Sequence, residues 1–261
     1  MYARIRAALA APDRFKRLID FFLGHLLYAL PARWRRRLFS GEAHFCPLCD
    51  SRLRIFLRLH RQFHLYCPVC GSLQRHRLVW LFFNSRYVQP GLKARRMLHI
   101  APEPALARKF RQLPGLDYLS ADLHDRSAMV KMDISAINMP DGSFDMIYCS
   151  HVLEHVSDDR RAMKEFFRLL RPEGWAVIIV PLFSEKTFED QTITGPEERQ
   201  KAFGQHDHVR SYGPDIKERL EQAGFMVRLV ETSDLADPEQ ARRLGLDNEE
   251  KIFYCRKELH Y

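Results

Sequence analysis

The sequence is poor in glycine and lacks a long uninterrupted apolar run. Its 261 residues include 12 glycines and six cysteines. The most apolar N-terminal segment, Leu18 to Leu30, is interrupted by Asp20 and His25, so it is too short and too polar to span a bilayer. No small-x-small cleavage site follows it, which argues against a signal peptide. The segment is better explained as an amphipathic helix that lies on a membrane surface or packs on the protein itself.

Acidic residues are scarce in the first part of the chain. Residues 1–40 carry two acids against nine Lys and Arg, and residues 41–90 carry two against seven, whereas residues 91–261 carry 29 against 25. The formal net charge of +8 therefore arises entirely from the first 90 residues. Such a region favours an anionic partner, either RNA or an anionic membrane surface. A solvated charged surface is the alternative.

The cysteines are few, but four of them form a pattern. Two C-x-x-C pairs, Cys46/Cys49 and Cys67/Cys70, are separated by 17 residues. Each pair can direct two thiolates at one point, and two pairs complete the tetrahedron that zinc prefers. Gly71, directly after the second pair, permits the tight turn. A redox-active pair and a disulfide set are alternatives, but two matched pairs favour structural zinc.

The residues around the cysteines predict a ribbon followed by a helix. The segment from Arg52 to His60 alternates apolar and basic residues and predicts one half-buried strand. After the second pair, Ser72 fits the N-cap of a helix. Arg75, His76 and Arg77 fall in the first turns of this helix, where they would either bind phosphate or stay solvated.

From residue 95 onward, strand and helix patterns alternate, which predicts a parallel α/β sheet with helices on both faces. The predicted strands cover residues 96–100, 117–121, 130–134, 143–149, 175–181, 225–231 and 251–257. The predicted helices cover residues 105–112, 157–174 and 213–225. We therefore divide the chain into a basic amphipathic helical segment (1–40), a zinc ribbon with its following helix (41–90) and an α/β domain (91–261).

The motifs MLHIAPE, DYLSADL, VKMDISAINMPDGSFDMIYCSHVLEHV and LRPEGWAVIIVP follow one another in this order. Over about residues 95–258 the chain resembles a class I S-adenosylmethionine-dependent methyltransferase of the type 11 group, here with an N-terminal four-cysteine zinc ribbon. The resemblance implies a Rossmann-like seven-stranded sheet, S-adenosylmethionine as cofactor, and methyl transfer to an O or N atom of an RNA, a lipid-linked glycan or a small molecule. We expect a cytoplasmic location, with peripheral membrane attachment as the alternative. The competing hypothesis is a catalytically inactive, methyltransferase-like zinc-ribbon protein that binds a partner such as nucleic acid.

The strand ends supply the candidate cofactor-binding residues, because open α/β sheets bind ligands there. Asp122 fits a carboxylate that accepts from the ribose hydroxyls, and Asp133 fits an acceptor for the adenine amino group; ordinary turn residues are the alternative for both. The turn after the first strand contains no glycine, and we hypothesise that Glu103 pairs there with the cofactor's ammonium group. The alternative is a first-turn helix acid in a site that has lost its cofactor. The other candidates are His99, Ala101, Leu123, Met132, Ser150 and His151.

Polar residues beyond the fourth strand are candidates for methyl transfer. His155 and His208, together with Asp207, are candidate catalytic residues, because histidine titrates near neutrality and can act as a general base. Similarity to small-RNA 2′-O-methyltransferases and quinone-pathway O-methyltransferases implies a divalent metal instead, although those families tend to have Glu at the place of His151. Its ligands would be His151, Glu154, His155 and a histidine of the long connection. In a third interpretation His155 only packs and caps a helix. The connection from residue 182 to residue 212 is predicted to be an acceptor-binding lid.

Overall fold

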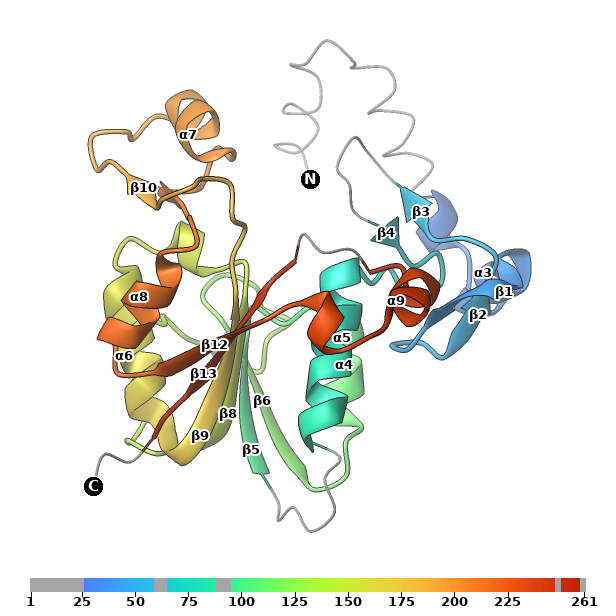
Figure 1. The fold of residues 1–261 in the computed structure, drawn as a ribbon, viewed down its shortest axis with the longest axis horizontal. Helices are drawn as coiled ribbons and strands as arrows, with labels where there is room; N and C mark the ends of the chain where they lie inside the picture. The colour runs from blue at the N-terminus through green and yellow to red at the C-terminus, as the bar shows by residue number, and fades with distance from the viewer. Residues whose placement is uncertain (1–25, 59–64, 88–94, 247–249, 259–261) are drawn as a thin grey trace. The chain divides into compact units, whose positions relative to one another are not determined.

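The computed structural model describes residues 26–58, 65–87, 95–246 and 250–258, and the chain divides into two compact units (Figure 1). The first unit comprises the described residues up to 87 together with residues 232–246. The second comprises residues 95–231 and 250–258. The domain limits at residues 40 and 90 stay a prediction, and most of the predicted amphipathic helix lies outside the described residues.

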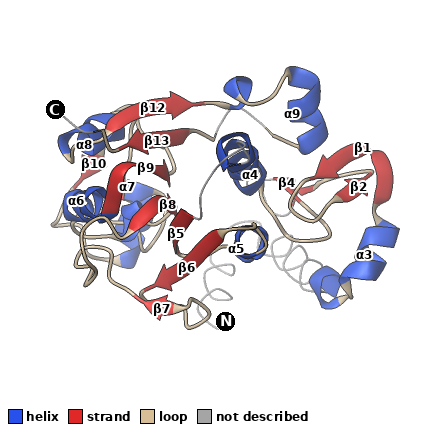
Figure 2. Cartoon of the chain, turned by 90° about the horizontal axis from the view of Figure 1, so that it is seen from below, coloured by secondary structure: helices blue, strands red, loops and turns tan. Residues whose placement is uncertain are grey.

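The first unit is built from two antiparallel strand pairs with helices around them (Figure 2). β1 pairs with β2, and β3 pairs with β4. The elements of this unit are α3 (Ala32–Leu38), β1 (Ser40–Cys46), β2 (Ser51–Leu53), β3 (Leu57–Arg58), β4 (Leu65–Tyr66), α4 (Gln74–Tyr87), a 3-10 helix (Thr232–Asp234) and α9 (Pro238–Leu244). One C-x-x-C turn follows β1 and the other follows β4, so the two hairpins carry the four cysteines.

The segment between the cysteine pairs is not the single strand that its alternation predicts. The strand breaks between β2 and β3, where Ile55 is 47% exposed and Phe56 is buried, the reverse of the predicted pattern. The guanidinium of Arg77 lies over the Phe56 ring, 4.0 Å from its centroid, and this contact holds the ring inside. The prediction that Ser72 is the N-cap of this helix is also wrong. α4 begins at Gln74, and the carbonyl of Leu73, the residue before it, accepts the first helical hydrogen bond, from the N–H of Arg77.

Arg77 joins the hairpins to α9 within the first unit. It is fully buried, and it donates to the carbonyl oxygens of Ser72 (2.9 Å) and Leu65 (3.1 Å). It also donates to the carbonyl oxygens of Leu244 (2.6 Å) and Gly245 (2.8 Å). The prediction that Arg77 binds phosphate or stays solvated is therefore wrong: its donors satisfy backbone acceptors that would otherwise be buried without partners.

The second unit contains a seven-stranded sheet in the order β12-β13-β9-β8-β5-β6-β7. All neighbouring strands are parallel except β13, which is antiparallel to both β12 and β9. The strands are β5 (Arg95–Ile100), β6 (Leu116–Asp122), β7 (Val130–Lys131), β8 (Phe144–Ser150), β9 (Leu170–Ile179), β12 (Met226–Val230) and β13 (Ile252–Arg256). This topology confirms the predicted α/β fold with a Rossmann-like seven-stranded sheet.

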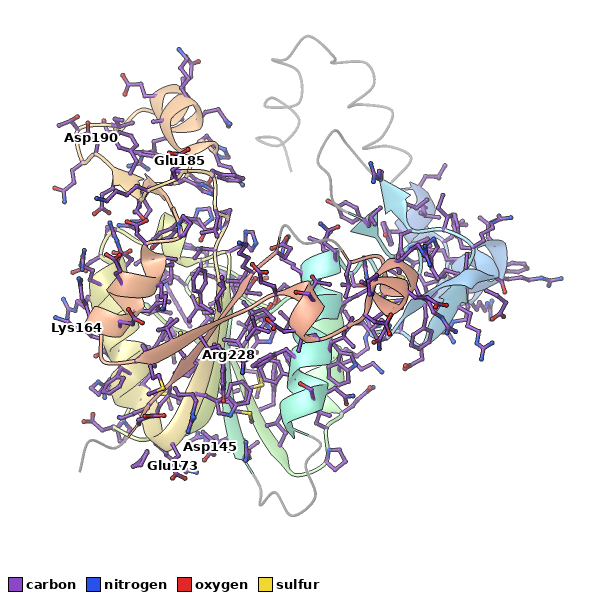
Figure 3. All side chains as sticks on the ribbon, in the orientation of Figure 1. Asp145, Lys164, Glu173, Glu185, Asp190 and Arg228 are labelled. Atoms are coloured by element: carbon purple, nitrogen blue, oxygen red, sulfur yellow. The ribbon has the colours of Figure 1, made fainter. Side chains whose placement is uncertain are left out.

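Helices cover both faces of this sheet (Figure 1). They are α5 (Pro104–Arg111) on one face, and α6 (Asp159–Leu169) and α8 (Ile216–Gln222) on the other. α6 buries Met163, Phe166 and Leu169 in the core, as its apolar spacing predicts. Lys164 on α6 and Arg228 on β12 are exposed charged residues of the outer surface (Figure 3).

The helix α6 ends five residues before the predicted stop at Gly174. It ends at Leu169, and β9 begins with the next residue. The ammonium group of Lys257 donates to the carbonyl oxygens of Phe167 and Leu170, both at 2.9 Å. These bonds satisfy two of the carbonyls that a helix end leaves without partners. Lys257 is 90 positions away from Phe167, so the residues around the end of α6 gave no sign of these bonds.

The long connection after β9 has structure of its own. It contains β10 (Phe188–Glu189), α7 (Pro196–Phe203) and β11 (Arg210–Ser211), and β10 pairs antiparallel with β11. β10 and α7 lie beyond the carboxyl ends of β8 and β9 (Figure 1). The role of this connection as an acceptor-binding lid stays a prediction. In the part of the chain that the structure describes, no helix is both long and apolar enough to cross a membrane.

Candidate active site and candidate zinc centre

The four cysteines of the two C-x-x-C turns lie together in the first unit. Their Sγ atoms are all within 4.8 Å of one another, with 3.7 Å between Cys46 and Cys70 and 3.7 Å between Cys49 and Cys67. Zn–S bonds of about 2.3 Å in a tetrahedron separate the sulfurs by about 3.8 Å, so the cluster has the dimensions of a four-cysteine zinc site. Gly71 has a φ of +74°, which is the conformation for which the second turn needs a glycine.

The carboxyl ends of β5 and β8 mark the point where the strand order reverses, because β6 lies on one side of β5 and β8 on the other. Ligands of open α/β sheets bind at such a point. The residue after each strand has a left-handed backbone conformation. Ala101, after β5, has a φ of +49°, and His151, after β8, has a φ of +53°. This conformation costs a residue other than glycine about 1–2 kcal/mol. Backbone strain of this kind gathers at functional sites, and Ala101 here takes the conformation that a glycine usually supplies.

Glu103 belongs to a buried chain of hydrogen bonds beside this turn. Its Oε1 accepts from the hydroxyl of Tyr148 (3.1 Å), and its Oε2 lies 2.8 Å from Nε2 of His99. Nδ1 of His99 lies 2.8 Å from the hydroxyl of Tyr118, and burial raises the pKa of Tyr118 to about 12. A neutral His99 that donates through Nε2 and accepts through Nδ1 satisfies all these atoms.

Asp122 is the last residue of β6, and Asp133 lies two residues after the end of β7. Oδ1 of Asp122 accepts from the backbone N–H groups of His124 (2.6 Å) and Asp125 (2.7 Å), which uses one of its two carboxylate oxygens. Hydrogen bonds from Ser135 hold the pKa of Asp133 below its usual value. Both side chains are therefore held by hydrogen bonds from the residues that follow them, near the strand ends.

The two apolar cofactor candidates flank these aspartates. Leu123 is 40% exposed, and Met132 is half-buried. Met132 and Asp133 line a pocket of about 310 Å³ in the second unit together with Leu119 and Met139. A flat apolar group such as an adenine fits between side chains of this type.

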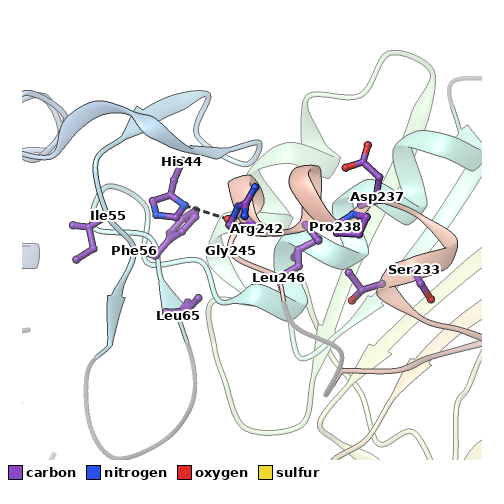
Figure 4. A pocket seen from close by; sticks show the side chains of 13 residues that line it. His44, Ile55, Phe56, Leu65, Ser233, Asp237, Pro238, Arg242, Gly245 and Leu246 are labelled. Carbon is purple, nitrogen blue, oxygen red and sulfur yellow. Dashed lines mark hydrogen bonds between the residues drawn. The ribbon is translucent and has the colours of Figure 1, made fainter.

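A second pocket, of about 680 Å³, lies in the first unit (Figure 4). His44, Ile55 and Phe56 line it from the hairpins, and Pro238 and Arg242 line it from α9. The ring of His44 faces the carbonyl oxygen of Arg242 at 3.2 Å. None of the site residues predicted from the sequence lines this pocket.

Glu154, His155 and His208 form a cluster with ligand atoms within 4.8 Å of one another. Glu154 and His155 belong to the 3-10 helix Leu153–His155 that follows β8. Glu154 is 1% exposed, and among the described residues neither of its carboxylate oxygens has a hydrogen-bond partner, nor does Nε2 of His208. Nδ1 of His151 lies 3.5 Å from Oε1 of Glu154. Buried polar atoms without partners are rare and indicate an ion or a water that satisfies them.

The two histidines of this cluster are each engaged at Nδ1. Nδ1 of His208 lies 3.1 Å from the carbonyl oxygen of Phe203, and Nδ1 of His155 lies 3.5 Å from a carboxylate oxygen of Asp207. Metal-binding histidines are typically oriented in this way, with the other ring nitrogen left as the ligand. Burial lowers the pKa of His208 below its ordinary 6.5, so its imidazole is neutral at pH 7. The structure thus brings together the three catalytic candidates His155, Asp207 and His208.

Sequence reasoning missed the buried ion network that holds this cluster in place. Arg210 donates to the carbonyl oxygens of Leu153 (2.8 Å) and Ser157 (2.9 Å), on either side of Glu154 and His155. Its Nε lies 3.0 Å from a carboxylate oxygen of Glu189. Nothing in the sequence indicated which backbone carbonyls Arg210 would bind.

A second part of the network lies at the start of α6. Asp159 accepts from the hydroxyl of Tyr212 (2.6 Å) and from Arg219 (3.0 Å), and Nε of Arg210 lies 3.6 Å away. The side chains of Asp159, Arg210 and Arg219 are 4%, 4% and 9% exposed. The 3-10 helix that carries Glu154 and His155 is therefore fixed by charges that water does not screen.

Comparison with known proteins identifies the class of enzyme. Residues 98–178 match the protein-family model described as a methyltransferase domain. The ubiquinone biosynthesis O-methyltransferase of Burkholderia pseudomallei is 26% identical over 163 residues, which are 56% of this chain and 69% of that protein. A Mycolicibacterium smegmatis protein named a probable S-adenosylmethionine-dependent methyltransferase is 29% identical over 123 residues, 45% of this chain and 44% of that protein.

Solved structures give a weaker similarity. The Haemonchus contortus phosphoethanolamine N-methyltransferase 2 is 16% identical, with a TM-score of 0.47, and the match covers 69% of this chain and 53% of that chain. The fold assignment depends on the strand order given above and on the family match, rather than on this similarity.

The chain carries a methyltransferase domain at residues 98–178, and its named relatives are methyltransferases, which supports the class I S-adenosylmethionine-dependent methyltransferase that its motifs predicted. It is an enzyme of that class, and the hypothesis of an inactive binding protein is not favoured. The roles of the individual site residues and the identity of the methyl acceptor stay predictions.

Proposed function

We propose that the protein is an O-methyltransferase that methylates a hydroxyl group of an organic acceptor with the help of a divalent cation. The observation that carries this proposal is the buried Glu154, whose carboxylate has no hydrogen-bond partner among the described residues and lies beside two imidazoles. A carboxylate removed from water requires a positive partner. The Burkholderia pseudomallei relative, an O-methyltransferase by name, supports oxygen as the accepting atom.

The residues at the ends of β5, β6 and β7 fit S-adenosylmethionine. When bound, this cofactor supplies a methyl group on a positively charged sulfonium. Asp122 would accept from the ribose hydroxyls through the carboxylate oxygen that its turn does not use, and Asp133 would accept from the adenine amino group. Glu103, fixed by Tyr148 and His99, would accept from the ammonium group in a charge-assisted hydrogen bond.

Glu154, His155 and His208 would hold the cation. A divalent cation bound there would lower the pKa of a coordinated hydroxyl group. Glu154 contributes the negative charge, and the two imidazoles contribute neutral nitrogen ligands. In this arrangement the histidines are ligands rather than general bases. Asp207, whose side chain is 51% exposed, orients His155 and can pass a released proton to water.

The cofactor part of this proposal is tested by titration calorimetry with S-adenosylhomocysteine. We expect Asp122→Ala to weaken binding at least about tenfold, because a hydrogen bond to a charged group contributes about 1.5–3 kcal/mol. Asp125→Ala is the matched control, because Asp125 is exposed and its carboxylate accepts from the backbone of Ser127 in the same turn region. Equal affinities for the two variants, or no heat with the unaltered chain, would overturn the assignment.

In the first unit, we propose that Cys46, Cys49, Cys67 and Cys70 bind a structural zinc ion. The support is the Sγ separation of 3.7 Å in two pairs and the convergence of four thiols in a largely buried cluster. Four thiolates brought this close repel one another unless a cation neutralises them. The ion would fix the two hairpins to each other and so hold the first unit together.

A further inference from the structure

Large apolar side chains are exposed on the segment that precedes the first hairpin. Leu26, Leu30, Trp34 and Leu38 are 68%, 42%, 53% and 51% exposed. Trp34 and Leu38 are four residues apart on α3 and are therefore neighbours on its surface, whereas Leu26 and Leu30 precede Pro31, the N-cap of α3. α3, which carries Trp34 and Leu38, has no buried residue. We call these four residues the apolar stripe.

Other residues of the same segment attach it to the cysteine turns. The hydroxyl of Tyr28 donates to the carbonyl oxygen of Cys67 at 2.8 Å. Arg35 contacts the carbonyl oxygen of Pro68 at 3.4 Å, and its guanidinium lies over the Tyr28 ring, 4.8 Å from the centroid. Arg36 donates to a carbonyl of the first cysteine turn at 3.0 Å. The segment thus has an attached side and an exposed side, and the apolar stripe belongs to the exposed side.

The charged residues in the same segment as the apolar stripe are all positive. Arg33 and Arg37 are exposed, they are four residues apart, and Arg37 is the i+3 neighbour of Trp34. Residues 26–41 contain no Asp or Glu. A surface that combines exposed leucines, a tryptophan and arginines therefore offers apolar area together with positive charge.

We propose that the apolar stripe, with Arg33 and Arg37, docks on the surface of an anionic phospholipid bilayer. An amphipathic helix with Trp and Leu on one face and basic residues at its flank buries its apolar face at the boundary between headgroups and acyl chains. Tryptophan favours this boundary, and each arginine near an anionic surface adds about 1 kcal/mol. RNA fits less well, because leucines neither stack on bases nor bind phosphate. The enzyme would then act at a membrane surface, whatever its acceptor.

The test is co-sedimentation of the full chain with vesicles of phosphatidylcholine alone and of phosphatidylcholine mixed with phosphatidylglycerol. We expect the chain to bind the mixed vesicles and to bind the neutral ones much more weakly. Arg33→Gln/Arg37→Gln should weaken binding to the mixed vesicles about 30-fold, which corresponds to two arginines at about 1 kcal/mol each. The control Arg108→Gln/Arg228→Gln removes the same charge from exposed positions of the second unit, of which Arg228 is labelled in Figure 3, and should leave binding within about twofold.

The apolar contribution is tested separately. Trp34→Ser/Leu38→Ser should weaken vesicle binding at least about tenfold, because two large apolar side chains lose their contact with the bilayer. Met129→Ser/Met226→Ser, at residues 56% and 54% exposed in the second unit, is the matched control. All four positions are exposed, so we expect unchanged thermal unfolding for both double variants.

Several outcomes would overturn the proposal. One is a chain that stays in solution with mixed vesicles, or that binds neutral vesicles equally well. Another is equal binding by each variant and its control. A third is a loss of affinity for a single-stranded RNA oligonucleotide in the arginine variant without vesicle binding, which would identify RNA as the partner. A fourth is a dimer of the unaltered chain that Trp34→Ser/Leu38→Ser converts to a monomer without vesicle binding, which would identify a second copy of this chain.

Discussion

The substitution Asp159→Asn tests how much the buried ion network contributes to the stability of the fold. Asp159 accepts from Tyr212 (2.6 Å) and Arg219 (3.0 Å) and lies 3.6 Å from Arg210. Asparagine has nearly the same shape, and its carbonyl can still accept from Tyr212. The substitution therefore removes one negative charge and little else. Arg210 and Arg219, whose side chains are 4% and 9% exposed, would then have Glu189 as their only carboxylate partner among the described residues.

The expected cost follows from the burial of these charges. Removal of one partner from a buried ion pair costs about 3–5 kcal/mol, because the other charge stays desolvated. Glu189 is 40% exposed and already contacts both arginines, so it offsets part of this loss. We therefore expect the free energy of unfolding to fall by about 3 kcal/mol, the lower end of that range.

Urea denaturation of the full chain measures this change, with the slope against denaturant unaltered. Asp158→Asn is the matched control at the preceding residue, because Asp158 caps α6 through the N–H of Arg161 at 2.9 Å and asparagine is an equally good N-cap. The control should cost less than about 0.5 kcal/mol. If the two variants lose the same stability, the network does not carry the energy that its geometry implies.

Three further outcomes follow from other parts of the structure. Ala101→Gly should raise the free energy of unfolding by about 1 kcal/mol, because it relieves a left-handed alanine; a decrease in urea denaturation would contradict the strain. Two hydrogen bonds from Arg168 (2.8 and 2.9 Å) lower the pKa of Glu165 from its ordinary 4.5, against the opposing effect of burial. Because the folded-state pKa of Glu165 is depressed, this stabilisation is complete above pH 4.5 and is lost as the pH falls below it. Glu165→Gln should therefore reduce the loss of unfolding free energy at acid pH. If the variant and the unaltered chain lose stability in parallel as the pH falls, the Glu165–Arg168 pair is not the cause. Cys46→Ser should abolish zinc binding measured by atomic emission, whereas Cys255→Ala, in the second unit, should retain it; equal zinc contents would exclude the cysteine cluster as the zinc site.

Local patterns predicted the features that depend on neighbouring residues. The two C-x-x-C pairs predicted four converging thiols, since seventeen residues between pairs suffice for a hairpin. The uninterrupted apolar run in β9 predicted a central strand, because a strand with both faces covered has no polar side. Alternation of strands and helices then predicted the α/β sheet. Each inference used residue spacing or periodicity that can be read along the chain.

The remaining features depend on contacts between distant residues, which no local pattern shows. Phe56 is buried in place of Ile55 because Arg77 covers its ring, and Arg77 in turn binds carbonyls 167 and 168 positions away. The left-handed φ of Ala101 was not predictable, because alanine carries no sign of that conformation. The candidate ligand Glu154 was named only through family similarity, and the structure showed that it is buried with no hydrogen-bond partner among the residues described.

The central claim is that Glu154, His155 and His208 hold a divalent cation. Titration of the full chain with Mn²⁺, with the free ion followed by electron paramagnetic resonance, measures this directly, because Mn²⁺ prefers oxygen and nitrogen ligands and does not compete for a thiolate site. We predict one bound ion per chain, with the affinity lost in Glu154→Gln and kept in Glu185→Gln, at an exposed residue of the connection after β9 (Figure 3). Equal binding by the two variants, or no binding by the unaltered chain, would contradict the claim.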